Sequence, residues 1–428
     1  MSFHLSTSFQ EKRKGASSRT VFLRSDEGRR LRYLQISSPA EAVLCLKEIG
    51  VDPYGIEAMV PKMSGINIRL DDLKPAVANI IKQEMLSLGG DAAVSRGTID
   101  CTVRRTGVVL MGTEKQITRL IEKISHQPLG LRKLASAIGE LLSNLRRNTF
   151  VLKTPRRKIT IAGRTLIMGI INLTPDSFSD GGRFRNIDDA ADYGVRLEEE
   201  GADILDIGGE STRPGSKRVN RKEEIGRVIP VLDKLVRRIR IPVSVDTMKA
   251  EVARAAIDSG AEIINDISAM RFDRKMAEVM AESRASVILM HMRGMPRTMQ
   301  EGDLTYGSLM GEIIRFLEGR IGKAVDGGVT RENIIVDPGV GFGKKAEDNL
   351  SIIRHLRELK TLGRPIALGP SRKAFIGKAT GVKIPAERIE GTAAAVTAAI
   401  MNGANILRVH DVGFMKRVAV MADDLSRD

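Results

Sequence analysis

The sequence contains no tryptophan and only four tyrosines in 428 residues. Proteins that bind single-stranded nucleic acids without sequence preference stack the bases on aromatic side chains, so this scarcity argues against a nucleic-acid partner. The two cysteines, Cys45 and Cys101, belong to no CxxC pair and no His–Cys cluster. This pattern indicates neither a disulfide framework nor a zinc site.

Long apolar runs are absent as well. No segment reaches the length of a membrane span, and no apolar segment precedes the small-residue cleavage site of a secretory signal. We therefore expect a soluble, cytoplasmic protein that does not associate with membranes. Hydrophobic residues make up 42% of the chain, which is enough for a sizeable core. At about 150 residues per domain, the length predicts two domains unless one is a large barrel.

Positive charge is in excess, with a net charge of +15, and this favours an anionic partner or substrate. Residues 1–32 hold eight Lys or Arg and three acidic residues. Their net charge of +5 is a third of the charge of the whole chain. The segment is rich in serine and has no sustained periodicity, so we expect residues 1–30 to form a basic, disordered leader. A nucleic-acid-binding arm or an organellar targeting peptide is the alternative, which the acidic residues and the weak amphipathicity disfavour.

Residues 31–150 have the mixed periodicity of a small α+β accessory domain, to which the sequence assigns no role and no catalytic constellation. The stretch 82–93 permits two interpretations, a ligand-binding loop or a helix that ends on Gly89–Gly90. The expected elements are a helix that begins near Ser38, helices at 73–88, 114–126 and 131–147, a strand at 66–70, and two short strands around Thr106–Gly107 within 101–113.

The rest of the chain, residues 151–428, is rhythmic. A basic, proline-containing connector at 153–158 predicts the domain boundary, and beyond it short apolar runs alternate with amphipathic stretches about eight times. This spacing is typical of a (β/α)8 TIM barrel, with an open doubly wound sheet as the alternative. In either case the uninterrupted apolar strands favour a parallel sheet covered on both faces. The runs lie at 166–172, 202–209, 241–247, 262–268, 285–292, 334–339, 364–370 and 406–412.

Each of these runs has polar residues at its carboxyl end. In a barrel the carboxyl ends of the strands converge on one face, where active sites are found. Any single Asp or Asn at such a position could cap the next helix instead, but capping does not explain eight strand ends in succession. The residues are Asn172, Asp206 with Glu210, Asp246, Asn265 with Asp266, His291, Asp337, Lys373, and Arg408 with His410.

These polar residues divide by charge into two sets. Asp246, Asn265 and Asp337 offer acceptors and an amide suited to the edge of a polar heterocycle with several N–H donors. The other set suits a phosphate-type anion, has glycine-rich backbone at 181–182 and 208–209, and consists of Arg213, Lys373, Arg408 and His410. We therefore expect one pocket for a heterocycle and another for a diphosphate.

Two features resemble functional motifs, a phosphate-binding loop and a catalytic histidine, but the sequence favours a structural interpretation of each. GVGFGK at 339–344 resembles a phosphate-binding loop, but Pro338 takes the place of its first glycine, and Ala346 rather than Ser or Thr lies nearby. We interpret it as a flexible loop between a strand and a helix. His291 stands between two methionines after an apolar strand, which is more typical of a satisfied histidine at the edge of a core than of a catalytic base.

Seven segments between about 160 and 428 resemble, in order, the signature motifs of the dihydropteroate synthase family: NLTPDSFSDGG, GADILDIGGESTRPG, VSVDT, INDIS, VDPGVGFGK, GPSRKAFIG and ILRVHDV. Seven motifs in register form a specific match. The resemblance implies a pterin-binding TIM barrel and a transferase activity. The enzyme would condense 7,8-dihydropterin-6-ylmethyl diphosphate with 4-aminobenzoate and release pyrophosphate and 7,8-dihydropteroate. This is the step of folate biosynthesis that sulfonamides block.

The resemblance also implies roles for individual residues and a homodimeric state. The pterin would be held by Asp246, Asn265, Asp337 and Lys373, with Arg408 against its ring. The diphosphate would bind Arg213, Arg408 and His410, and Asn172 would contact its Mg²⁺. The aminobenzoate pocket would be formed by Phe178, Thr212, Arg213, Pro214, Phe342 and Ser371. Catalysis would depend on Arg213, Asp246, Lys373, Arg408 and His410.

The chain departs from the family pattern in three places. Ala374 stands where many relatives have Ser, which removes a hydroxyl contact to the aminobenzoate carboxylate, although backbone amides at that helix start could still bind it. Val340 takes a place often held by Phe. The accessory domain is absent from the short members of the family.

The substrates implied by the resemblance favour a dissociative displacement. The methylene cation left by the departing diphosphate is delocalised into the electron-rich dihydropterin ring. Mg²⁺ and the Arg/His cluster would stabilise the charge on the leaving group, and mobile loops would exclude water from the cation.

Two rival functions belong to different classes. A methyltransferase that binds methyltetrahydrofolate in a similar barrel would need the Asp/Asn pocket but no diphosphate site, and the GESTRPG and SRK segments argue against it. A non-catalytic pterin or anion sensor would use the accessory domain as its output. The presence of Asn172, Arg213 and Lys373 argues against a loss of catalysis.

Overall fold

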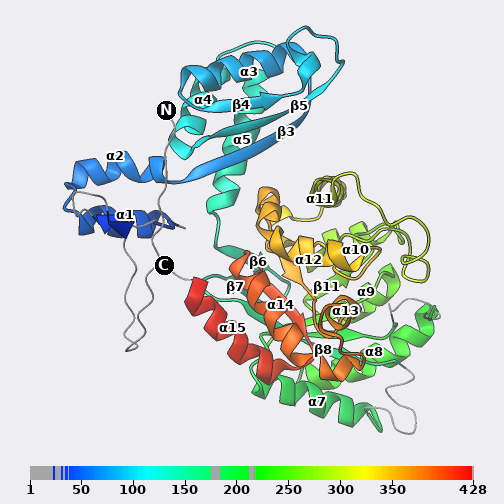
Figure 1. The fold of residues 1–428 in the computed structure, drawn as a ribbon. Coiled ribbons are helices and arrows are strands. Elements are labelled where there is room, and N and C mark those ends of the chain that lie inside the picture. The colour runs from blue at the N-terminus through cyan, green and yellow to red at the C-terminus, as the bar shows by residue number, and fades with distance from the viewer. Residues whose placement is uncertain are drawn as a thin grey trace. The chain divides into compact units, whose positions relative to one another are not determined.

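The structure is a computed structural model that describes residues 34–426 except 37, 175–183, 212–215 and 217, together with the backbone of 23–24 and 30–31. The chain divides into two compact units, residues 1–129 and 130–427 (Figure 1). The predicted leader lies almost entirely outside the described residues. The division falls earlier than the predicted domain boundary at residue 150, so the helix that follows Gly130 belongs with the second unit.

The first unit is built on a three-stranded antiparallel sheet in the order β3-β5-β4. Alternate strand residues such as Ile68 and Leu110 are buried, and α3 and α4 contact the central strand. Ser38 caps the first helix as predicted, since its Oγ accepts from Glu41 N (3.1 Å). The elements are β1 (Leu23–Arg24), β2 (Arg30–Leu31), α1 (Pro39–Glu48), α2 (Pro53–Met63), β3 (Gly65–Leu73), α3 (Pro75–Ser87), β4 (Asp91–Val94), a 3-10 turn (Arg96–Thr98), β5 (Thr106–Thr113) and α4 (Glu114–Ser125).

The prediction of two short strands within 101–113 is wrong. Residues 101–105 lie in turns and irregular backbone, and Thr106–Gly107 begin the single strand β5 instead of joining two strands. β5 is a strand because it pairs on both sides with segments remote in sequence, for example Leu110 with Ile68 and with Ala92. A local pattern cannot reveal such partners.

The second unit is a closed barrel of eight parallel strands. They follow one another in the order β13-β12-β11-β10-β9-β8-β15-β14, and a bridge between Val336 and Ile366 joins the two ends of the sheet. The predicted (β/α)8 barrel is therefore confirmed over the open sheet. Its strands are β8 (Leu166–Asn172), β9 (Ile204–Gly208), β10 (Val243–Asp246), β11 (Ile263–Asp266), β12 (Ser286–Met290), β13 (Ile334–Asp337), β14 (Ala367–Leu368) and β15 (Ile406–Val409).

Helices alternate with the strands, so both faces of the sheet are buried. Ile207 packs in the cluster between strands and helices with Leu232, whereas Met168 and Ile288 fill the barrel interior. This two-sided burial explains why the strands are continuous apolar runs. The helices are α7 (Ile187–Glu199), α8 (Arg221–Leu235), α9 (Ala250–Asp258), α10 (Met276–Ser283), α11 (Leu309–Asp326), α12 (Ala346–Arg354), α13 (Ala374–Thr380), α14 (Ile389–Met401) and α15 (Val412–Ser426), with 3-10 turns at Arg331–Asn333, Leu356–Leu362 and Pro385–Glu387.

A hairpin of β6 (Phe150–Lys153) and β7 (Lys158–Ile161) closes the amino-terminal end of the barrel. Leu152 and Ile161 join the cluster that fills the barrel interior. Asn333 binds the hairpin through Lys153 N and O, both at 2.7 Å. The basic stretch predicted as a connector is therefore the turn of this hairpin, with its apolar neighbours buried in the barrel.

Helix α5 (Leu131–Arg146) lies against the 3-10 turn Leu356–Leu362 of the second unit. We expect deletion of residues 1–129 to leave the barrel folded and deletion of 1–150 to destabilise it. The longer deletion removes buried side chains such as Leu131 and Ile138, each of which contributes about 1.5–3 kcal/mol when fully buried. Urea unfolding of the two shortened chains measures the difference. Equal free energies of unfolding would contradict the placement of α5 in the barrel unit.

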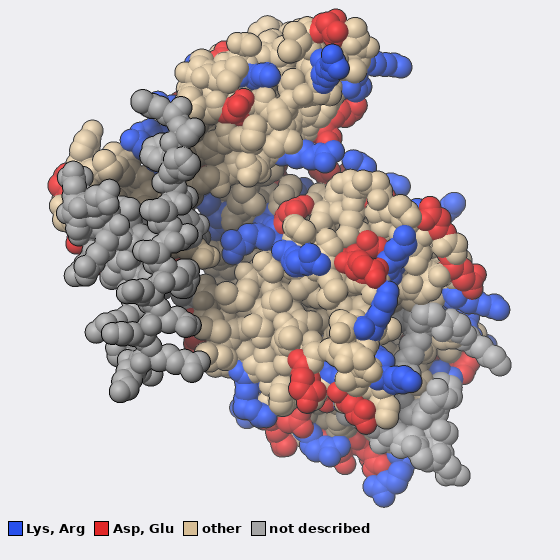
Figure 2. All heavy atoms as spheres, in the orientation of Figure 1, with Lys and Arg blue, Asp and Glu red and all other residues tan. Residues whose placement is uncertain are grey.

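The surface shows no field of a single sign in the view of Figure 2, where basic and acidic side chains are interspersed. Some of them form ion pairs between neighbouring helices, such as Arg221 with Glu251 (2.6 Å). Among the described residues, no helix has both the length and the apolar composition that a bilayer crossing requires.

Candidate active site

Four positions at the carboxyl ends of neighbouring strands lie in one row. The register pairs Asn172 of β8 with Gly208 of β9, Gly208 with Asp246 of β10, and Asp246 with Asn265 of β11. Gly208 has no side chain, and a Cβ at that position would lie 3.9 Å from Asn172 Oδ1 and 4.0 Å from Asp246 Oδ2. The glycine therefore leaves a space beside an amide oxygen and a carboxylate oxygen at the mouth of the barrel.

Two carboxylates hold Arg408 of β15 inside the barrel. Its Nε donates to Asp206 Oδ2 (2.5 Å) and its Nη2 to Asp246 Oδ2 (3.1 Å). Asp206 is fully buried and also accepts from Asn265 Nδ2 (3.3 Å), while its Oδ1 has no partner among the described residues. Asp206 thus connects two predicted site residues, Arg408 and Asn265, although the sequence marked it only as a strand end.

Lys373, just after β14, lies across the loop that follows β13. Its Nζ donates to Val340 O and lies 4.3 Å from the centroid of the Phe342 ring. Gly341 makes this approach possible, because its φ is 83° and a Cβ would lie 3.0 Å from Lys373 Cδ. Asp337 attracts the ammonium group of Lys373 electrostatically, as does Asp246. The structure therefore brings all five predicted pterin residues to the same end of the barrel.

Burial perturbs the ionisation of these groups. It raises the pKa of Asp246 to about 7, with Arg408 opposing the shift and Asp206 adding to it, and it raises the pKa of Asp337. It lowers the pKa of Lys373 to about 8 against the attraction of Asp337. For Arg408, burial is outweighed by Asp206 and Asp246, which raise its pKa and keep it charged. Asp246 and Lys373 therefore titrate near neutral pH, as groups in functional sites often do.

Lys344 holds the loop 339–344 from within. Its buried Nζ donates to three carbonyl oxygens, those of Gly339 (2.8 Å), Phe342 (3.0 Å) and His291 (3.2 Å). Because these bonds occupy the ammonium group, the segment is no phosphate-binding loop, in agreement with the sequence. The same bonds anchor the loop that the sequence predicts to be flexible. Sequence reasoning missed this role, which only the burial of the lysine reveals.

Ser371 and His410 lie side by side beyond β14 and β15. Ser371 Oγ is 3.0 Å from His410 Nδ1 and accepts from His410 N (3.2 Å). Arg372 between Ser371 and Lys373 pairs instead with Asp411 (Nε to Oδ2, 3.0 Å). Ser371, predicted for the aminobenzoate pocket, therefore orients the histidine of the predicted anion site.

The loop after β9 is anchored at its base. Glu210 accepts from Val219 N (3.2 Å) and from Lys249 Nζ (2.5 Å), and Lys249 also pairs with the buried Glu224. Sequence reasoning missed Lys249 and Glu224, because no local pattern shows that their helices meet. Four predicted site residues lie outside the described residues: Phe178, Thr212, Arg213 and Pro214.

His291 is a core residue. It is 6% exposed and packs edge-on against Phe316 at 4.9 Å between ring centroids. Burial, with Lys344 and Arg271 nearby, lowers its pKa to about 2, so it does not act as a base near neutral pH. The sequence suggested a histidine with all its hydrogen bonds made, but His291 Nδ1 has no hydrogen-bond partner among the described residues.

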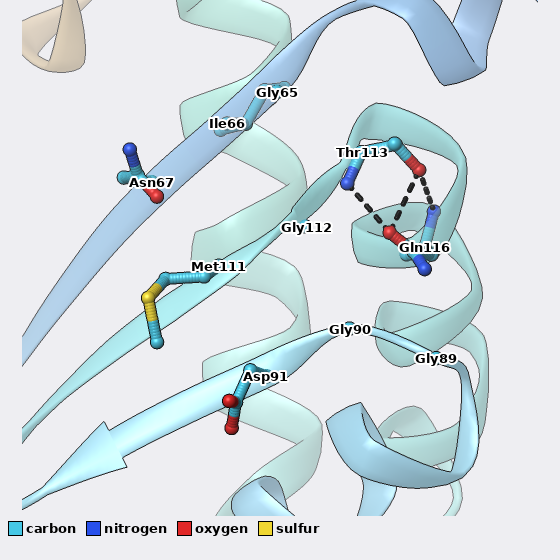
Figure 3. A pocket seen from close by; sticks show the side chains of 10 residues that line it. All are labelled: Gly65, Ile66, Asn67, Gly89, Gly90, Asp91, Met111, Gly112, Thr113 and Gln116. Carbon is cyan, nitrogen blue, oxygen red and sulfur yellow. Dashed lines mark hydrogen bonds between the residues drawn. The ribbon is translucent and has the colours of Figure 1, made fainter. Parts of the chain in front are cut away.

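A separate open pocket of about 560 Å³ lies in the first unit (Figure 3). Asn67, Met111 and Asp91 stand side by side on its three strands. Thr113 and Gln116 satisfy the first amides of α4 through a capping box. The interpretation of 82–93 as a helix that ends on glycines is confirmed, since α3 ends before Gly89–Gly90. These glycines also line the pocket, but the interpretation as a ligand-binding loop stays a prediction. Among its described lining residues, no buried polar side-chain atom lacks a partner, so nothing there indicates a ligand.

Comparison with known proteins gives matches to the barrel unit. The family model for pterin binding enzymes matches residues 168–410. Dihydropteroate synthase from Synechocystis sp. is 49% identical over 265 residues, which cover 62% of this chain and 91% of the relative. The solved structure of Xanthomonas albilineans dihydropteroate synthase with 4-aminobenzoic acid has 43% identity and a TM-score of 0.61, covering 65% of this chain and 99% of that one.

A second structure of the Xanthomonas albilineans enzyme, in complex with 7,8-dihydropteroate, has 40% identity and a TM-score of 0.58 over 65% of this chain and 99% of that one. The family match contains Asn172, Asp246, Asn265, Asp337, Lys373, Arg408 and His410, and none of the first unit. The chain therefore belongs to the dihydropteroate synthase family of pterin-binding enzymes.

Proposed function

We propose that this chain condenses 7,8-dihydropterin-6-ylmethyl diphosphate with 4-aminobenzoate and releases 7,8-dihydropteroate and pyrophosphate. As a member of its family, it is a transferase. One observation carries the proposal: the carboxylates, amide and cations suited to a pterin meet at one end of a closed barrel. Related structures contain 4-aminobenzoic acid and 7,8-dihydropteroate.

The pterin is the substrate that this chain's buried groups hold. Asp246 and Asp337 accept from ring N–H and exocyclic NH₂ groups, and the Asn265 amide can both donate and accept. Lys373 donates to a ring acceptor, and the guanidinium of Arg408 lies against the ring. A charged acceptor forms a stronger hydrogen bond than a neutral one, so the ionised form of Asp246 is the binding form.

The anion site receives the leaving diphosphate. Arg408 and His410 are its described members, with Ser371 orienting the histidine. Arg213 completes the site in this proposal. These groups stabilise the negative charge that develops on the departing oxygen, while the carboxylate of Asp246 balances the cation left on the pterin methylene. The arylamine nitrogen then attacks that carbon and loses its proton afterwards, so no protein base is required.

Magnesium would be held mainly by the substrate. Among the described residues, no group of three His, Cys, Asp or Glu side chains could hold a metal ion, which excludes a dedicated cage within that part of the chain. Mg²⁺ is commonly bound by one or two protein oxygens together with substrate phosphates and water, and the Asn172 amide oxygen beside Gly208 fits that pattern. When bound, the ion would neutralise charge on the diphosphate.

Incubation of the purified full chain with dihydropterin methyl diphosphate, Mg²⁺ and 4-aminobenzoate tests the proposal. We expect pyrophosphate and dihydropteroate in equal amounts, measured enzymatically and by mass. Omission of 4-aminobenzoate should abolish dihydropteroate formation. Pterin binding without product would favour another arylamine or a sensor, and methyl transfer from methyltetrahydrofolate would favour the methyltransferase alternative.

We also propose that the enzyme works as a homodimer in the cytoplasm. Helix α15 exposes apolar side chains that a second copy could cover, including Val420 (51% exposed), Met421 (58%) and Leu425 (59%). Cys45 and Cys101 are free thiols, as is common in a reducing compartment. Sedimentation of the wild type and of Met421→Glu tests the dimer: the variant should sediment as a monomer, and an unchanged dimer would exclude α15 from the interface.

A further inference from the structure

A second pocket, of about 70 Å³ and with a basic lining, lies at the amino-terminal end of the barrel. It belongs to the second unit and is formed by α5, the start of β6, the 3-10 turn Leu356–Leu362 and the residues that immediately precede β14 and β15. The residues proposed for catalysis follow the strands instead, so the two sites lie at opposite ends of the barrel. The polar groups that line this pocket are Asn144, Arg147, Asn148, Lys360, Arg364 and Asn405.

The lining carries three cations and no carboxylate. Glu140 and Glu332 attract Arg364 electrostatically, but neither lines the pocket. Glu140 pairs with Arg331 on the surface at 3.5 Å. Positive charge therefore gathers in a confined space whose lining holds no carboxylate, and such a space favours an anion.

Arg364 is the most buried of the three cations. The residue is 5% exposed, and its Nη1 donates to Arg331 O (2.6 Å). Its Nε is fully buried and has no acceptor among the described residues. Burial, with repulsion from Arg331 and Arg147, lowers the pKa of Arg364 to about 10, so it is still charged at neutral pH. A buried charge with unused donors is unfavourable unless an anion or water satisfies it.

The neighbouring side chains that line the pocket provide further donors. Lys360 Nζ donates to Asn148 Oδ1 (3.0 Å) and keeps further N–H groups for another acceptor. Arg147 Nη1 donates to Gly363 O (3.4 Å), which uses only one of its donors. Asn405 Oδ1 accepts from Ile366 N (2.9 Å), and its amide N–H groups are donors as well.

We propose that this pocket binds one phosphate-type oxyanion through Arg147, Lys360 and Arg364, and that the anion ties α5 to the amino-terminal end of the barrel. A water needs roughly 10–15 Å³ of such space, so 70 Å³ admits several waters or one tetrahedral oxyanion, but no nucleotide. Two guanidinium groups provide the forked donors that phosphate oxygens accept. Inorganic phosphate or the phosphate group of a small monoester would satisfy the same donors.

Equilibrium dialysis of the full chain with radiolabelled inorganic phosphate, at constant ionic strength, tests the proposal. Four proteins are compared: the wild type, Lys360→Met, Arg364→Met, and the control Arg357→Met. The control removes the same charge from the same 3-10 turn, but Arg357 does not line the pocket. Phosphate that binds at the proposed diphosphate site is common to all four proteins and cancels in the comparison. If Arg364→Met fails to fold, the half-buried Lys360 still provides a test.

The wild type and Arg357→Met should bind one more phosphate per chain than the two lining variants, or bind it at least tenfold more tightly. Equal phosphate binding by all four proteins would overturn the proposal, because a purely structural role for these cations predicts no such difference. Competition with glycerol 3-phosphate identifies the source. If glycerol 3-phosphate displaces the labelled phosphate that the wild type binds and the lining variants do not, the site accepts the phosphate group of a monoester. If only unlabelled phosphate displaces it, the site is closed around the free ion.

Discussion

Replacement of Arg408 with Ala should lower kcat/KM for dihydropterin methyl diphosphate by about three orders of magnitude. Loss of a single preorganised donor to a developing oxyanion costs about 10²–10³ in rate, and Arg408 is proposed to contact both the pterin and the diphosphate. The substitution also leaves Asp206 and Asp246 buried without their cation. Breaking such a buried pair costs about 3–5 kcal/mol, so unfolding must be measured together with the kinetics.

Two further variants separate the effect on chemistry from the effect on folding. Arg372→Ala is the matched control, because Arg372 pairs with Asp411 and no described contact joins it to the proposed pterin groups. It should retain kcat/KM within about threefold, as expected for a partly exposed ion pair. The double variant Arg408→Ala with Asp206→Asn removes one unpaired charge and should regain stability without regaining activity. Near-normal activity in a folded Arg408→Ala enzyme would contradict the assignment of Arg408.

The pH dependence of kcat/KM should be bell-shaped, rising through about pH 7 and falling above about pH 8. Burial, with Asp206 nearby, raises the pKa of Asp246 to about 7, so the carboxylate that accepts from the pterin is present only above that pH. Burial lowers the pKa of Lys373 to about 8, so its charge is lost as the pH rises further. The two limbs report the free enzyme, because kcat/KM profiles do so.

Each limb should disappear in a different variant. Asp246→Asn cannot ionise, so the rise near pH 7 should vanish. kcat/KM should also fall by about 10²–10³, the effect of losing charged hydrogen bonds worth about 1.5–3 kcal/mol each. Lys373→Arg stays charged, and the fall above pH 8 should vanish while the rise persists. Persistence of both limbs in both variants would assign the titrations to other groups.

The barrel was predictable because its signals are local and repeated. Strands buried on both faces, such as β8 and β9, are continuous apolar runs, and amphipathic stretches separate them. The first unit was less predictable. β5 depends on pairing with β3 and β4, and the short β4 has no distinctive pattern of its own. The hairpin turn at 154–157 resembled a linker because its charged residues conceal the apolar alternation on either side.

The residues of the candidate site could be predicted from their position and type, whereas the residues that hold them in place could not. Asp246, Asn265 and Asp337 were recognisable as polar residues at the ends of apolar strands. The roles of Asp206, Lys249 and Lys344 depend on burial and on partners remote in sequence. Nothing in a single sequence shows which charged residues are buried, so such supporting contacts require the folded chain.

A crystal structure of the full chain with dihydropterin methyl diphosphate and Mg²⁺ would show directly which residues hold the pterin and which hold the diphosphate. We expect the pterin edge against Asp246, Asn265 and Asp337, with the diphosphate directed toward Arg408 and His410. A pterin bound elsewhere, or bound in the barrel with its diphosphate away from Arg408, would contradict this expectation.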